Sequence, residues 1–132
     1  MAKRNTDKNV YAWAQAVSMR YGRQLDEYLT LDECQALAAH VCGEHGADIP
    51  TVEDNPHTQT ASATLTTIKL PKWAQTNAGV LHEVTHVILK AQDNHSHDSE
   101  FTTLYVSLMA QYAGVDAGRI KEMGTKYGVK FA

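Results

Sequence analysis

The sequence predicts an α+β fold that is mostly helical, with a small β-sheet placed before the third long helix. Three observations predict it. Apolar residues recur every three or four positions in several segments, which is the period of an α-helix. Residues 61–70 are instead rich in β-branched side chains and stop at Pro71, as a strand does. The length of 132 residues, with 43% apolar and 20% charged residues, suits one globular domain, residues 1–132.

Two helices are predicted in the first third of the chain, over residues 7–21 and 31–42. Each has an apolar stripe at helical spacing and is followed by a glycine, Gly22 or Gly43, which is a common C-terminal cap. The second helix also has a start signal, because Thr30 is followed three residues later by a glutamate in the spacing of a capping box.

The middle of the chain predicts the sheet. A short strand is expected over residues 49–52, followed by a turn that contains Pro56. The main strand is expected over residues 61–70.

Three further helices are predicted in the second half. The third helix covers residues 74–91, and a polar loop over residues 92–98 follows it. The fourth runs from residue 99 to 112 and ends before Gly114, and the last covers residues 116–126.

Composition excludes several classes of protein. The formal net charge of −3 lacks the basic footprint of a nucleic-acid-binding protein. No apolar run approaches the roughly 20 residues that cross a bilayer, and no signal-peptide stretch is recognisable, so we expect a cytoplasmic protein. Cys34 and Cys42 fall on one predicted helix, roughly 12 Å apart, which is too far for a disulfide.

Residues 82–86, His-Glu-Val-Thr-His, carry the chemistry that the sequence predicts. Residues four apart share a helix face, so His82 and His86 can turn ring nitrogens toward one point, as zinc requires. Glu83 is displaced from that point but can reach a water molecule there, which suits a general base. The pattern predicts a metal site with zinc as its ion, against the alternative of two surface histidines on an amphipathic helix.

A catalytic zinc site usually has a third protein ligand and leaves one position to water. His97, eleven residues after His86, is the first candidate, because it stands just before a predicted helix start. The remaining candidates are His95, as the second choice, and then Asp93, Asp98 and Glu100.

Four segments follow one another in a recognisable order: Tyr11-Ala12-Trp13, Ile68-Lys69-Leu70-Pro71, His82-Glu83-x-x-His86 and His97-Asp98-Ser99-Glu100-Phe101. In this order the chain resembles a family of small metallohydrolases of bacteria and their viruses, whose downstream motif is usually His-Gly-Pro-Glu-Phe. It is similar, more distantly, to the SprT-like metalloproteases.

The resemblance implies a minimal zincin-like fold and a Zn²⁺ ion held by His82, His86 and His97. It also implies that Glu83 is the catalytic acid and base, and that Phe101 is a packing residue. In zincins the strand before the motif helix often presents its edge to an extended peptide, so the resemblance further implies that residues 64–70 can bind one by strand addition. This chain has Asp98-Ser99 where the family has Gly-Pro; if that glycine has a positive φ, aspartate tolerates it better than most residues.

The predicted function is therefore zinc-dependent hydrolysis, with a peptide or protein as the expected substrate. Two alternatives are a hydrolase of amides outside proteins and a non-catalytic zinc-containing binding or regulatory module. The second would have a closed site of four protein ligands, for example if His95 and His97 both bound. Tyr105 or Tyr112 can stabilise an oxyanion, although their place on an apolar helix face is explained equally well by packing.

A second set of metal-ligating side chains consists of Cys34, His40, Cys42 and His45. Their spacing matches no zinc motif. We therefore expect buried thiols and surface histidines there.

Overall fold

The computed structural model describes residues 3–90 and 97–132, and the fold is α+β and mostly helical, as predicted. The chain divides into two compact units. One contains residues 27–92 and holds the sheet; the other contains residues 1–26 and 93–132 and is helical. Both units contain buried apolar side chains, among them Trp13 and Leu108 in the helical unit and Val41 and Ile68 in the sheet unit.

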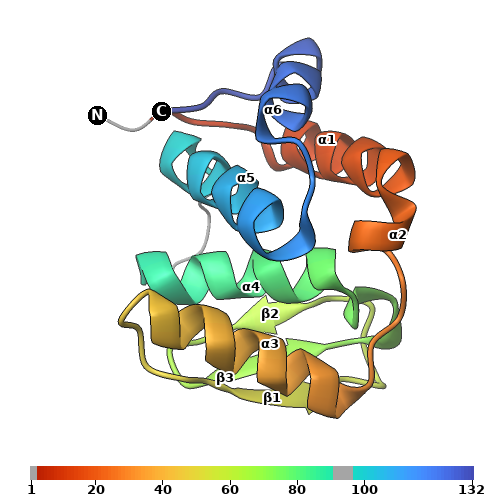
Figure 1. The fold of residues 1–132 in the computed structure, drawn as a ribbon, viewed down its shortest axis with the longest axis vertical. Helices are drawn as coiled ribbons and strands as arrows, with labels where there is room; N and C mark the ends of the chain where they lie inside the picture. The colour runs from red at the N-terminus through yellow and green to blue at the C-terminus, as the bar shows by residue number, and fades with distance from the viewer. Residues whose placement is uncertain (1–2, 91–96) are drawn as a thin grey trace. The chain divides into compact units, whose positions relative to one another are not determined.

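The sheet unit consists of two helices, three short strands and one 3₁₀ turn (Figure 1). The strands lie in the order β1-β3-β2; β3 is parallel to β1 and antiparallel to β2. Helix α3 packs against α4 and β1, and α4 also packs against β2 and β3. The elements are α3 (Leu31–Glu44), β1 (Thr51–Asp54), β2 (Ser62–Ala63), β3 (Thr67–Leu70), η1 (Lys72–Ala74) and α4 (Asn77–Leu89).

The prediction of one strand over residues 61–70 was wrong, because a turn divides this segment into β2 and β3. The Thr64 hydroxyl accepts hydrogen bonds from the amides of Thr66 and Thr67, at 3.2 and 3.0 Å. A threonine side chain that bonds nearby amides in this way competes with the strand ladder. The expected edge was also wrong: β3 is the central strand, and β1 and β2 form the edges. The strand expected over residues 49–52 begins two residues later, as β1.

The third predicted helix is shorter than residues 74–91. Residues Lys72–Ala74 form the 3₁₀ turn η1, and α4 begins after Thr76, whose hydroxyl accepts a hydrogen bond from the Gly79 amide at 3.1 Å. Lys90 ends α4 with a left-handed φ of 55°. Residue 91 lies outside the described residues. The capping box of α3 is formed as predicted, with Thr30 as N-cap, although the helix continues through Gly43 to Glu44.

The helical unit consists of α1 (Asp7–Arg20), α2 (Gly22–Leu25), α5 (Ser99–Ala113) and α6 (Ala117–Lys126) (Figure 1). Gly22 was predicted to cap the first helix, but it begins the short helix α2 instead. The Tyr21 amide closes α1 by bonding to the Val17 carbonyl at 2.9 Å, with a φ of −118° at Tyr21, so the helix ends without a glycine. Gly114 caps α5 with a positive φ of 75°, as predicted.

Trp13 is the centre of this unit and is fully buried. Its indole Nε1–H donates to the Ile120 carbonyl at 2.8 Å, which satisfies its one polar group. Edge-to-face contacts join its ring to Tyr105 and Phe131, at centroid distances of 6.2 and 5.5 Å. Trp13 therefore ties α1 to α5, α6 and the C-terminal segment.

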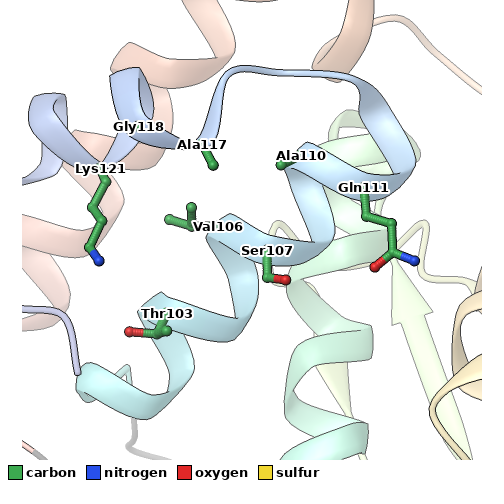
Figure 2. A pocket seen from close by; sticks show the side chains of 8 residues that line it. All are labelled: Thr103, Val106, Ser107, Ala110, Gln111, Ala117, Gly118 and Lys121. Carbon is green, nitrogen blue, oxygen red and sulfur yellow. The ribbon is translucent and has the colours of Figure 1, made fainter.

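A surface hollow lies along α5 and α6 in the same unit (Figure 2). Small and polar side chains line it, among them Thr103, Ser107, Ala110 and Lys121. Within the described residues, none of the helices has the length and apolar character to cross a membrane.

Candidate metal centre

Histidines 82 and 86 stand one turn apart on α4, in the middle of a continuous helix. Helix α4 packs against α3 and the sheet, and its residues Val80, Leu81 and Val84 are fully buried. This packing fixes the rotation of α4 about its axis. The two imidazoles therefore lie together, with ring centroids 5.2 Å apart, as the four-residue spacing requires.

Glu83 lies beside this pair and is only 5% exposed. One of its carboxylate oxygens, Oε2, is 3.9 Å from the Nε2 atom of His82. Burial disfavours the charged carboxylate and raises the pKa of Glu83 to about 8. Buried carboxylates are uncommon unless something compensates for the lost hydration, so Glu83 stands out as a candidate functional group.

His97 is the residue that precedes the N-cap of α5, and it is 7% exposed. Its Nδ1 atom lies 2.9 Å from Oδ1 of Asp7, at the start of α1. Two aromatic rings contact its imidazole edge to face: Tyr11 at 5.3 Å and Phe101 at 4.8 Å between centroids. Phe101 is fully buried, which is the packing role expected for it.

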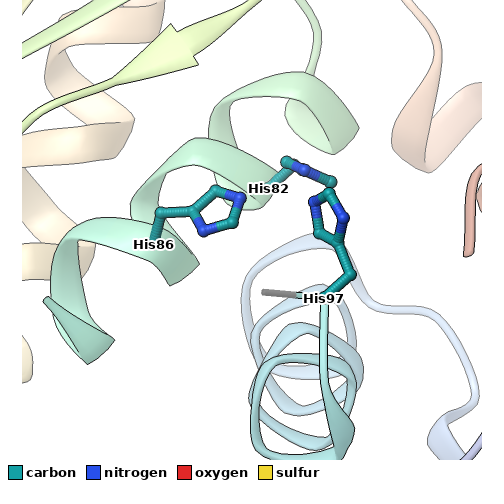
Figure 3. A group of neighbouring side chains, drawn as sticks. All are labelled: His82, His86 and His97. Atoms are coloured by element: carbon teal, nitrogen blue, oxygen red, sulfur yellow. The ribbon is translucent and has the colours of Figure 1, made fainter. Parts of the chain in front are cut away.

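Figure 3 shows the three imidazoles, two from α4 and one from the residue before the α5 cap. His82, His86 and His97 form a group that can hold a metal ion, because one ligand atom from each lies within 4.8 Å of the others. Three neutral imidazoles are a donor set that suits zinc and several other transition metals. Among the candidates for the third ligand that lie in the described residues, His97 is the one that belongs to this group.

The other candidates for the third ligand either have other roles or lie outside the described residues. Asp98 is the N-cap of α5, and its Oδ1 atom accepts hydrogen bonds from the amides of Glu100 and Phe101, both at 3.1 Å. Its φ is −73°, so this position requires no positive φ. Glu100 is exposed. His95 and Asp93 lie outside the described residues.

The second set of metal-ligating side chains does not form a cluster in residues 3–90 and 97–132. Cys34 and Cys42 are buried free thiols, and burial raises the pKa of each to about 11. His40 is exposed and lies 3.5 Å from Glu44 on the same helix. These residues match the expectation of buried thiols and surface histidines.

Tyr105 is buried against Trp13 and Phe101, so packing accounts for its position. An oxyanion-stabilising role for Tyr105 or Tyr112 stays a prediction. None of the predicted site residues lines the hollow along α5 and α6.

Asp7 contacts a candidate ligand 90 residues further along the chain. From the sequence, Asp7 was predicted only as the first residue of a helix. Spacing along a chain carries no signal for such a contact, because it depends on how α1 and α5 pack. A second missed residue is Asn5, whose side chain bonds the His97 carbonyl at 2.9 Å.

The chain matches no protein-family model, and neither a curated protein nor a solved structure is significantly similar to it. The geometry of the histidine group therefore carries the functional argument.

Proposed function

We propose that this protein is a zinc-dependent hydrolase with a zincin-like arrangement, and that His82, His86 and His97 hold the metal ion. The observation that carries the proposal is the close grouping of three imidazoles beside a buried carboxylate. Burial disfavours the ionised form of Glu83, and a cation held by the adjacent histidines would compensate for this cost.

The donor set favours zinc in an open site. Zinc in enzymes typically takes three protein ligands and keeps one position for water, whereas structural sites use four protein ligands, often cysteines. Within the described residues, the group contains three histidines and no cysteine. Zinc held here would polarise a substrate carbonyl and lower the pKa of a water molecule to about 7.

Glu83 is the proposed general base. It follows His82 directly on α4, and its carboxylate lies next to the His82 ring. In the proposed reaction it accepts a proton from the attacking water and delivers that proton to the leaving nitrogen as the amide bond breaks. A group that must both take and return a proton works best with a pKa near the working pH.

A peptide is the proposed substrate class. The antiparallel strand β2 is an edge of the sheet and packs against α4, the helix that carries two of the ligands. An extended peptide can add to such an edge through main-chain hydrogen bonds, which brings its amide bonds alongside the helix. The edge at β2 thus replaces the edge at residues 64–70 that the sequence suggested.

The test is the metal content of the dialysed protein, measured by elemental mass spectrometry after zinc loading. The wild type should hold about one zinc ion per chain. The His97→Ala variant should lose it or bind it far more weakly, and the control His40→Ala, which removes an exposed histidine, should keep it. A wild type that holds no zinc after loading would contradict the proposal.

Catalysis is tested separately with a peptide library and the Glu83→Gln variant. This variant should retain zinc and show no cleavage, because the ligands remain while the base is lost. Zinc bound in full by the wild type and a failure to cleave any peptide would favour a regulatory module. The His95→Ala variant, with its zinc retained, would show that the site is not closed by a fourth histidine.

A further inference from the structure

The segment before α1 is attached to the segment that carries His97. The Ser99 amide donates to the Lys3 carbonyl at 2.8 Å, and the Lys3 amide donates to the Ser99 hydroxyl at 2.7 Å. The Asn5 side-chain amide donates to the His97 carbonyl at 2.9 Å. These three bonds hold the main chain from the His97 carbonyl to Ser99.

Asn5 extends this attachment to the C-terminal segment. Its side-chain oxygen accepts a hydrogen bond from the Lys130 amide at 2.7 Å, and its Nδ2 also reaches the Lys130 carbonyl at 3.1 Å. The side chain of Asn5 is therefore used as both donor and acceptor. The N-terminal segment from Lys3 is consequently part of the packed helical unit.

Asp7, at the start of α1, contacts the side chain of His97. An ionised carboxylate can only accept hydrogen bonds, so at the 2.9 Å contact the His97 Nδ1 atom must be the donor. A neutral imidazole that is protonated at Nδ1 presents its lone pair at Nε2. A hydrogen bond to the ring nitrogen that does not bind the metal is the usual way in which proteins fix the tautomer of a ligating histidine.

We propose that Asp7 is a positioning residue, which holds the His97 imidazole in the Nδ1–H tautomer so that Nε2 is the metal-binding atom. The proposal rests on the proposed function for the identity of the metal site. The rings of Tyr11 and Phe101, which contact the imidazole edge to face, restrict its rotation. Packing sets the plane of the imidazole, and Asp7 selects the nitrogen that faces the metal.

The expected loss of zinc affinity on replacing Asp7 depends on how exposed the Asp7 carboxylate is to water. The His97 side chain is 8% exposed, but the Asp7 side chain is 62% exposed, so water competes for its carboxylate. Loss of such a partner typically weakens metal binding about 10- to 100-fold. For an exposed carboxylate we expect the lower end, about 10-fold.

The first measurement is zinc affinity by competition with a chelator, for the wild type, Asp7→Ala and Asp7→Asn. Asp7→Ala should raise the Kd for zinc about 10-fold. Asp7→Asn should restore part of the affinity, because its side-chain oxygen still accepts a hydrogen bond from Nδ1–H. Asp32→Ala is the matched control, because Asp32 also lies in the first turn of a helix, α3, and its removal should leave the Kd unchanged.

The second measurement is made without metal, from the ¹⁵N chemical shifts of the His97 ring at pH 8, where an ordinary imidazole is neutral. The wild type should show the Nδ1–H tautomer, and Asp7→Ala should show a mixture of both tautomers. A loss of folding in Asp7→Ala would be visible in the same spectra, and Asp7→Asn would then carry the comparison of tautomers.

The two proposals fail in different ways. A wild type without zinc overturns the zinc hydrolase, while the tautomer still decides whether Asp7 orients His97. A wild type that binds zinc, together with an Asp7→Ala variant of equal affinity and the same tautomer, overturns the positioning role alone.

Discussion

Replacing Glu83 by glutamine should stabilise the metal-free protein, and the gain should grow with pH. Glu83 is 5% exposed, and burial raises its pKa to about 8 from an ordinary value of 4.5. Below pH 4.5 the carboxyl is protonated in the folded and the unfolded chain, and its titration costs nothing. Between pH 4.5 and 8 the unfolded chain releases a proton that the folded chain keeps, so the free energy of unfolding falls as pH rises.

The magnitude follows from the two pKa values. Each pH unit in this window corresponds to roughly 1.4 kcal/mol, so the wild type should lose at most about 5 kcal/mol by pH 8. Glutamine has almost the same shape and does not ionise. The stability of Glu83→Gln relative to the wild type should therefore be near zero at pH 4.5 and should rise by about 4 kcal/mol between pH 5 and 8.

The assay is urea unfolding of chelator-treated protein at several pH values, with the midpoint and slope fitted for each variant. Taking the difference between variant and wild type removes the titration of all other groups. Glu53→Gln, at an exposed position in β1, is the control and should show no pH-dependent difference. A constant difference between Glu83→Gln and the wild type across the pH range would show that the pKa of Glu83 is not raised in the folded chain.

Two further predictions concern the sheet unit. Gly79→Ala should destabilise it by roughly 3 kcal/mol or more in urea unfolding, because the new Cβ would lie 2.0 Å from the Ala74 carbonyl oxygen. Gly43→Ala, at a helical position with open space around the new Cβ, should instead stabilise it by about 0.5–1 kcal/mol. A change of the same sign in the free energy of unfolding for both variants would contradict this prediction. Cys34 and Cys42, with pKa values raised to about 11, should react with a thiol reagent at pH 8 only after urea unfolds the chain, and fast reaction of the folded protein would show that they are not buried.

Features that depend only on residues close together in the sequence could be predicted from it. The capping box at Thr30 and the glycine cap at Gly114 both formed, because each needs only a few residues of the same segment. The pair of histidines on α4 belongs to the same class, since four residues of helix suffice to place them. The order of the helices along the chain follows from the same local signals.

Features that depend on pairing between distant segments could not be predicted. A β-branched run such as residues 61–70 is compatible with one long strand or with a hairpin, and the Thr64 hydroxyl decides for the hairpin. The central place of β3 follows from its parallel pairing with β1, in the register Val52 with Ile68. Nothing in the composition of either strand states that register.

Asp98 and Ser99 both have a structural role at the start of α5. Asp98 caps α5 through its side chain, and the amide of Ser99 donates to the Lys3 carbonyl. A proline at position 99 would have neither this amide nor a hydroxyl to accept the Lys3 amide, so both bonds to the N-terminal segment would be lost. Ser99 thus attaches the segment before α1 next to His97, and Asp7 at the start of α1 bonds the His97 ring.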